Sequence, residues 1–308
     1  MSSSRNKTLT LTPEDEARLT ASLQRLTRPA TVADITDATF CQDLEEALTF
    51  MPAGFADLLV LDPPYNLSIQ FGDLHIARQS DEDYLQYLMQ WMPATLRLLK
   101  PCGSVYVCCD WLSSTTVYQA LKQCGVTLRN RITWQREKGR GAKDNWKNAM
   151  EDIWYGVVNP RDFYFDVEAV KQRRRVIAPY RTAEGQPKDW EETETGRFRL
   201  TCPGNFWDDI SIPYWSMAEN TPHPTQKPEK LVAKLILASC PAGGIVVDPF
   251  LGSGTTSVTA RKLGRHFVGI EQNAQYAAWA LKRLEMAETD SRIQGFADGC
   301  FWERNSGK

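Results

Sequence analysis

Residues 245–256 read Ile-Val-Val-Asp-Pro-Phe-Leu-Gly-Ser-Gly-Thr-Thr, an apolar run that breaks at an acid into a glycine-rich turn. This pattern predicts a buried strand, a turn whose glycines let the backbone approach a ligand closely, and then a helix. Free N–H groups at the start of that helix would suit a carboxylate or a phosphate. The next apolar run, residues 266–271, ends in Glu271, and an acid at that place can accept hydrogen bonds from both hydroxyls of a ribose.

The glycine turn indicates the kind of nucleoside ligand. Dinucleotide sites usually show a fuller Gly-x-Gly-x-x-Gly pattern, which is absent after Gly252. The strand, turn and acid-ended strand together therefore fit S-adenosylmethionine better than NAD.

A second motif, Asp62-Pro63-Pro64-Tyr65, ends the apolar run 58–61. Each proline fixes its own φ and restricts the residue before it, so the carboxylate and the ring are held at set angles. An exocyclic amino group of a base becomes nucleophilic only when acceptors draw on its N–H bonds. The Asp62 carboxylate and the Pro63 carbonyl could supply these acceptors, with the Tyr65 ring stacked on the base. Taken alone, the four residues are also compatible with a simple strand-ending turn.

The order of these motifs resembles the β-group of amino-DNA methyltransferases, the N6-adenine/N4-cytosine family, in which Asp-Pro-Pro-Tyr precedes Phe-x-Gly-x-Gly. A third signature, His-Pro-Thr-Gln-Lys-Pro at residues 223–228, stands just before the glycine turn, as in that family. Gly-Asn-Phe-Trp at 204–207 resembles the segment that leads into it. The resemblance spans roughly residues 37–285 and departs at Leu251, where many relatives have Ala.

The resemblance implies a doubly wound, mostly parallel α/β methyltransferase sheet with an irregular target-recognition insertion. It implies transfer of a methyl group from S-adenosylmethionine to a flipped adenine in duplex DNA. The expected organisation is a polar N-terminal arm, a catalytic half, a recognition region that contains part of the sheet at 150–158, a cofactor-binding half and a C-terminal tail. These five parts span residues 1–30, 31–135, 136–215, 216–290 and 291–308.

The resemblance also assigns site residues. Catalysis falls to Asp62, Pro63, Pro64 and Tyr65. Cofactor contacts are expected from the glycine turn, the acid-ended strand and the third signature: Asp248, Phe250, Leu251, Gly252, Ser253, Gly254, Thr255, Glu271, Gln272, Asn273, Thr225 and Lys227. Among these, Asp248 is expected near the α-amino group, Glu271 at the ribose, and Thr225 and Lys227 at the methionine carboxylate.

Local charge favours DNA as the substrate, although the formal net charge is −2. Basic residues gather between 129 and 147 and again between 171 and 181, and such clusters supply phosphate contacts. For any single arginine a solvated face is the alternative, and for Asp43, which precedes a helix, the alternative is an N-cap. The residues expected to contact DNA are Asp43, Asn66, Arg136, Lys138, Arg140, Lys143, Arg173, Arg174 and Arg175.

Composition sets further expectations. With 308 residues, 42% hydrophobic, the chain can form one large α/β domain plus an insertion. Its three histidines lack metal-ligand spacing and its eight cysteines include no Cys-x-x-Cys, so no metal is implied and buried free thiols are favoured. We find no apolar segment of membrane-spanning length and no signal-peptide core, and we expect a cytoplasmic protein of a prokaryote or phage.

Apolar spacing predicts most of the remaining elements. Helices are expected over 13–26, 81–100, 113–124 and 228–240. Strands are expected over 103–109, 129–135 and 152–158, whereas 166–203 is charged and irregular.

Three other functions remain open at this stage. Methylation of cytosine N4 uses the same chemistry, although Asp62 and the Asn66 that follows Tyr65 look more like the adenine enzymes. Protein or RNA amino-methyltransferases usually place the glycine turn before the Pro-Pro-Tyr platform. A DNA-binding regulator with an inactive methyltransferase fold is the third, and it would not need the complete set of chemical residues seen here. A homodimer and a cognate restriction endonuclease are partners that the resemblance leaves open.

Overall fold

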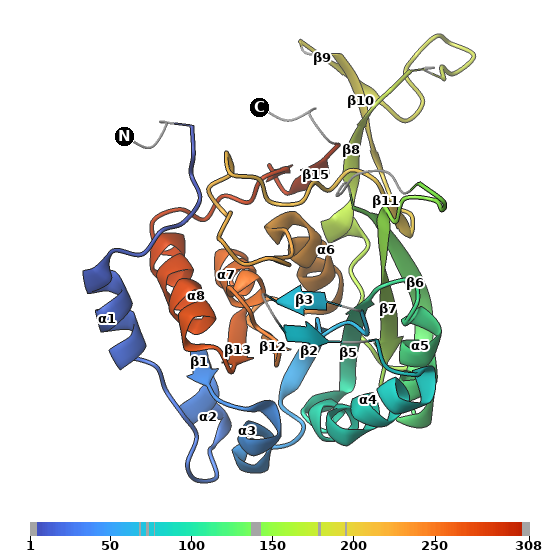
Figure 1. Ribbon diagram of the computed structural model, residues 1–308. Helices are drawn as coiled ribbons and strands as arrows, with labels where there is room; N and C mark the ends of the chain where they lie inside the picture. The colour runs from blue at the N-terminus through green and yellow to red at the C-terminus, as the bar shows by residue number, and fades with distance from the viewer. Residues whose placement is uncertain are drawn as a thin grey trace.

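The computed structural model describes residues 5–67, 69–71, 74–76, 78–136, 143–177, 180–194 and 196–303. Its centre is an eight-stranded sheet in the order β1-β13-β12-β2-β5-β7-β6-β11 (Figure 1). β7 is antiparallel to β5 and β6, and the other neighbouring pairs are parallel. The strands are β1 (Ala38–Cys41), β2 (Ala56–Leu61), β5 (Leu99–Cys109), β6 (Thr127–Gln135), β7 (Met150–Val157), β11 (Phe206–Trp207), β12 (Ile245–Asp248) and β13 (His266–Glu271).

Helices cover both faces of this sheet, because each of its central strands is apolar on both sides. Leu59 and Leu61 of β2 pack with one set of helices, whereas Leu58 and Val60 pack with the other. The first set is α3 (Leu44–Phe50), α4 (Asp81–Leu96) and α5 (Ser114–Gln123), and the second is α6 (Glu229–Ser239), α7 (Thr255–Lys262) and α8 (Ala274–Ala287). This arrangement confirms the doubly wound, mostly parallel α/β fold.

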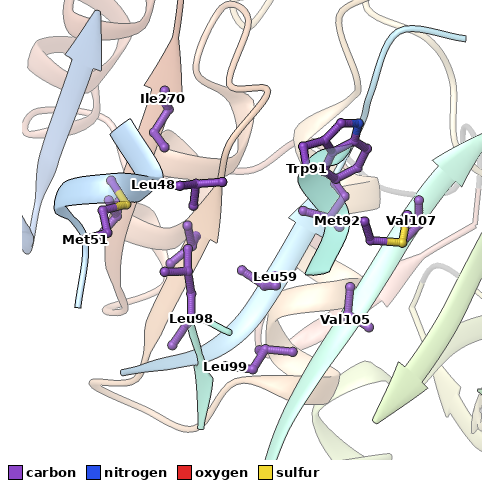
Figure 2. Close-up of a cluster of buried hydrophobic side chains, with 14 of the residues drawn as sticks. Leu48, Met51, Leu59, Trp91, Met92, Leu98, Leu99, Val105, Val107 and Ile270 are labelled. Carbon is purple, nitrogen blue, oxygen red and sulfur yellow. The ribbon is translucent and has the colours of Figure 1, made fainter. Parts of the chain in front are cut away.

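The layer under α3 and α4 is the larger apolar core. Figure 2 shows part of it, with Leu59 of β2 and Val105 of β5 alongside Trp91 and Met92 of α4. All four side chains are at most 3% exposed. Trp91 also meets the ring of Phe250 edge to face, with 4.8 Å between centroids, so this core supports the segment that follows β12.

Several elements differ from expectation. β6 and β7 each begin two residues early, and the described residues of the stretch 166–203, which was expected to be irregular, form a short helix and three strands, so that expectation is wrong. α4 ends at Leu96 and β5 begins at Leu99, so the predicted helix is four residues too long and the predicted strand starts four residues late. Leu98 lies in the turn and Leu99 in the strand, and both are buried. Because they continue the apolar spacing of the helix, the sequence pattern extends the predicted helix past its end. α1 (Pro13–Ala21) is shorter than expected, and α2 (Val32–Ile35) follows it.

A second, five-stranded sheet projects from one end of the main sheet (Figure 1). Its order is β14-β15-β8-β10-β9, so residues near the C-terminus pair with the insertion. Phe301, which is fully buried, stands opposite Gln172. The segment expected as a C-terminal tail therefore contributes strands through residue 302. The strands are β8 (Gln172–Arg175), β9 (Glu191–Thr193), β10 (Gly196–Thr201), β14 (Phe296–Ala297) and β15 (Cys300–Trp302), with the short helix η1 (Glu168–Val170) before β8 and a separate hairpin formed by β3 (Ile69–Phe71) and β4 (Leu74–Ile76).

The N-terminal arm is fastened at two places. Arg18 of α1 pairs with Glu285 of α8. Before α1, the N–H of Lys7 donates to the carbonyl of Trp215 and that of Leu9 to the carbonyl of Asn220. The arm therefore holds the segment that precedes the third signature. Within the described residues, none of the helices combines the length and apolar content that crossing a membrane requires.

Candidate active site

The two acid motifs meet at one edge of the main sheet. Asp62 follows β2 and Asp248 ends β12, and these two strands pair in parallel, with Val246 opposite Leu58. The carboxyl ends of parallel strands share one edge, where open α/β sheets bind ligands. A cavity at this edge is lined by residues of all three signatures, among them Asp62, His223, Thr225, Lys227, Asp248 and Gly252.

Steric constraints explain the glycines of the turn. Gly254 has a φ of 84° at the N-cap of α7, and a Cβ there would lie 2.5 Å from the Cβ of Ala280. Gly252 has a φ of 55°, and a Cβ on it would lie 3.1 Å from the Nε2 atom of His223. Gly254 is therefore required where the start of α7 packs against α8, and Gly252 where the turn passes the His223 ring at the cavity. Leu251, where many relatives have Ala, packs against Gly269 of β13.

Glu271 joins this turn to the end of β13. Its carboxylate accepts the N–H of Gly252 at 2.8 Å and the N–H of Asn273 at 2.7 Å. Burial raises the pKa of the Glu271 carboxyl group. Asn273 caps α8 with its side-chain oxygen, and Gln272 is exposed between them. Phe250, Leu251, Ser253 and Thr255 line the cavity with Asp248.

Asp248 is a buried acid whose hydrogen-bond donors are neutral. It accepts the Thr256 hydroxyl at 2.5 Å and the Phe250 N–H at 3.0 Å. Burial raises the pKa of Asp248 to about 7. A ligand with an ammonium group would favour the ionised form, so the site fits the amino-acid end of S-adenosylmethionine.

Asp248 also makes a pH-dependent prediction. Its folded-state pKa of about 7 lies above the ~3.9 of an exposed aspartate, so its contribution to stability is complete below about pH 4 and is lost as the pH rises through 7. Asp248→Asn removes that loss. We expect the difference in melting temperature, variant minus wild type, to be larger at about pH 8 than at about pH 5. Thermal unfolding of cofactor-free protein measures this, and a pH-independent difference would contradict the assignment.

The motif at residues 62–65 is contacted by the side chains of Tyr84, Glu151 and Lys227. Tyr84 of α4 donates its hydroxyl to the carbonyl of Pro64 at 3.1 Å. The Tyr65 hydroxyl lies 3.0 Å from Asp62 Oδ1 and 3.1 Å from Glu151 Oε2, where it can donate to either carboxylate. Lys227 donates to both oxygens of Asp62, at 2.8 and 2.7 Å. Pro63, which follows Asp62 in the motif, is buried.

Lys227 lines the same cavity and pairs with Asp62, and its contact with a methionine carboxylate stays a prediction. Its ammonium is 3.4 Å from Glu151 in addition to its contacts with Asp62. Although burial opposes the charge, these two carboxylates raise the pKa of Lys227 above its ordinary value. The Thr255 hydroxyl donates to the Lys227 carbonyl at 3.0 Å and so ties the third signature to the glycine turn. Thr225 remains at the cavity and is exposed.

Glu151 is a site residue that sequence reasoning missed. It lies on β7, its side chain is 3% exposed, and it pairs with Arg136 at the end of β6. The available signal was an acid beside Asp152 at the start of an otherwise apolar strand. An acid buried in such a strand requires cationic partners.

The sequence model of the DNA methylase family, which covers N6 and N4 methyltransferases, matches residues 56–282, including all three signatures. The chain belongs to this family. It is 35% identical over 246 residues to the DNA adenine methyltransferase YhdJ of Escherichia coli (strain K12), covering 77% of this chain and 79% of that protein. It is 30% identical over 257 residues to the Type II methyltransferase M.HpaI of Haemophilus parainfluenzae, and the match covers 83% of this chain and 75% of that protein.

Solved structures share the fold of this DNA methylase. The cytosine-N4-specific PvuII DNA methyltransferase aligns with a TM-score of 0.59 at 18% identity, covering 82% of this chain and 90% of that one. The complex of M1.HpyAVI with S-adenosylmethionine aligns with a TM-score of 0.52 at 21% identity, and the alignment covers 80% of this chain and 98% of that one. At these identities the likeness concerns the fold alone.

Two residues expected to contact DNA make local hydrogen bonds in this structure, and their contact with DNA stays a prediction. Asp43 caps α3 by accepting the N–H of Glu46. Asn66 is buried, and its amide bonds the backbone N–H and carbonyl of Gln79, so it closes the loop between them. The N-cap was the alternative weighed for Asp43, whereas the loop bonds of Asn66 were not expected, because a short polar side chain bonds nearby backbone as readily as a ligand.

Among the described basic residues that were expected to contact DNA, three are paired with acids and two are exposed. Arg136 pairs with Glu151 at the catalytic motif. Arg173 lies 4.8 Å from the ring centroids of both Phe198 and Trp302, and so packs within the second sheet. Further ion pairs join Arg173 to Glu191 and Arg174 to Glu303, whereas Arg175 and Lys143 are exposed. Lys138 and Arg140 lie outside the described residues.

Proposed function

We propose that this DNA methylase is an adenine-N6 methyltransferase that uses S-adenosylmethionine and acts on duplex DNA. The observation that carries the proposal is that Asp62 and the glycine turn line a single cavity. The name of YhdJ, a DNA adenine methyltransferase at 35% identity, supports adenine as the target.

The cofactor supplies an electrophilic methyl group. Asp248 would face its amino group, Glu271 its ribose, and the glycine turn would pass close beside it. Asp62 and the Pro63 carbonyl would accept the two N–H bonds of the target amine and so raise the nucleophilicity of its nitrogen. Holding both reactants in one cavity supplies proximity and orientation.

The target base must leave the DNA helix to reach Asp62. Flipping costs a few kcal/mol, and stacking on an aromatic ring such as Tyr65 returns about 1–3 kcal/mol per base. The remaining cost would be met by hydrogen bonds in the cavity and by contacts to the DNA backbone.

We assign target recognition to residues 136–215 together with the C-terminal strands that complete the second sheet. In this division residues 1–30 form the arm, 31–135 the catalytic half and 216–290 the cofactor half. A DNA substrate implies a cytoplasmic enzyme in a prokaryotic or phage-infected cell. A homodimer is one possible assembly, and size determination in solution would test it. A cognate endonuclease is a second partner, and co-purification would test it.

Arg175 should contribute to DNA binding through phosphate contact. It is exposed on β8 of the second sheet, so Arg175→Ala should lower the slope of log K against log salt by about 0.9. Arg25→Ala is the matched control, because Arg25 pairs with Glu46 on α3, far from that sheet in Figure 1. Fluorescence anisotropy over a salt series measures both slopes, and an unchanged slope for the Arg175 variant would assign this residue to solvent.

The direct test of the proposal uses purified protein, unmethylated plasmid DNA and S-adenosylmethionine with a tritiated methyl group. We expect label in DNA, and single-molecule sequencing should place the modification on adenines within one recognition sequence. DNA that stays unlabelled would reject the proposed activity.

A further inference from the structure

Lys227 occupies the place that the proposed mechanism reserves for the target amino group. Its ammonium donates to both oxygens of Asp62, at 2.8 and 2.7 Å. It also lies 5.2 Å from the centroid of the Tyr65 ring. These are the acceptor and the ring that a flipped base would need. The base and the ammonium therefore compete for the same two groups.

Glu151 offers the ammonium a second acceptor. Its Oε2 atom is 3.4 Å from the Lys227 nitrogen. Although burial opposes ionisation, Lys227 and Arg136 hold the pKa of Glu151 below its ordinary value. Arg136 anchors this carboxylate from the end of β6, so it stays in place while Lys227 moves.

The charges of the cluster balance. Two carboxylates, Asp62 and Glu151, face the cations Lys227 and Arg136. Three neighbouring titratable groups are uncharged at neutral pH, because burial raises the pKa of Tyr65 and of the Cys108 thiol and lowers the pKa of His223 to about 4. Asp248, which lines the same cavity, has a pKa of about 7 and lies outside this pairing. A shift of Lys227 from Asp62 toward Glu151 therefore keeps both cations within the cluster, and Asp62 exchanges the ammonium for the N–H bonds of the entering amine, so that its charge keeps hydrogen-bond donors.

We propose that Lys227 is a positioning residue that fills the target-amine site of the DNA-free enzyme, and that Glu151 receives its ammonium when the base enters. This proposal rests on the proposed methyltransferase function. Removal of the Glu151 charge leaves Lys227 with Asp62 as its carboxylate partner, so Asp62 stays blocked. Removal of Lys227 in that background opens Asp62 again.

The test is a double-mutant cycle of Glu151→Gln and Lys227→Met, read as kcat for tritiated methyl transfer to DNA. Glu151→Gln keeps an oxygen for the Tyr65 hydroxyl, and we expect its kcat to fall about 30-fold with a cofactor dissociation constant within about twofold of wild type. The double variant should recover at least about fivefold over Glu151→Gln. Glu288→Gln, an exposed residue paired with Arg261, is the control and should match wild type.

Lys227→Met alone provides a second measurement that does not depend on folding of the Glu151 variant. Without the ammonium, Asp62 is open to the target amine before the base enters, so the KM for DNA at saturating cofactor should fall about tenfold relative to wild type.

Three results would overturn the proposal. A double variant no more active than Glu151→Gln would show a merely structural pair. A KM for DNA of Lys227→Met equal to that of wild type would show that Lys227 does not occupy the target-amine site. Wild-type protein that labels no DNA would reject the underlying function itself, so the two failures are distinguishable.

Discussion

Asp62→Ala lowers kcat for methyl transfer by about three orders of magnitude, the loss expected when a group that stabilises the transition state is removed. Asp62 is the carboxylate placed to accept an N–H bond of the target amine, and the acceptor matters most while the nitrogen attacks. The dissociation constant of S-adenosylmethionine should change by less than about fivefold, because Glu271 and the glycine turn stay intact.

Single-turnover transfer of a tritiated methyl group measures kcat, and isothermal titration measures cofactor binding. Asp62→Asn keeps one oxygen acceptor and should lose less than the alanine variant. Asp290→Ala, which removes an exposed aspartate paired with Arg292, should behave as wild type. Near-normal transfer by Asp62→Ala would refute the assigned role of the motif.

Glu271→Ala raises the dissociation constant of S-adenosylmethionine by about 10- to 100-fold, the cost of losing hydrogen bonds to a charged group. The carboxylate would bind the ribose, and it also holds the N–H groups of Gly252 and Asn273. Because this binding is the same in the ground and transition states, kcat at saturating cofactor should stay near wild type.

Titration calorimetry and initial rates separate the two parameters. Glu271→Gln, which keeps an acceptor without the charge, should fall between wild type and the alanine variant. A fall in kcat with unchanged cofactor affinity would place Glu271 in the chemical step instead of at the ribose.

Much of the main sheet could be predicted from the sequence. β12 and β13 are apolar runs that end in Asp248 and Glu271, and both strands have the expected bounds. Such strands are readable because burial on both faces leaves a continuous apolar run with a polar end. The end of α4 was predicted less well, since the apolar residues of β5 continue its pattern.

The second sheet could not be predicted in this way. β8 reads Gln-Arg-Arg-Arg, with no apolar alternation, and its partner β15 comes from the far end of the chain. Arg173 of β8 lies over the rings of Phe198 and Trp302, a contact between segments distant in sequence. Local patterns carry no information on such pairing.

The charge cluster of the candidate site shows the same limit. Asp62, Glu151 and Lys227 come from the end of β2, from β7 and from the third signature. Each motif was found by its own residues, but the pairing between them depends on the topology of the sheet. Glu151 was missed because nothing near it in sequence marks it as a partner.

The central claim is transfer of a methyl group to the N6 atom of adenine, and the nucleosides of the methylated DNA test it most directly. DNA treated with the wild-type protein and S-adenosylmethionine is digested to nucleosides and separated by mass spectrometry, with DNA treated by Asp62→Ala as the reference. The account predicts N6-methyladenine as the dominant product, absent from the reference. A dominant N4-methylcytosine, or no methylated base, would contradict it.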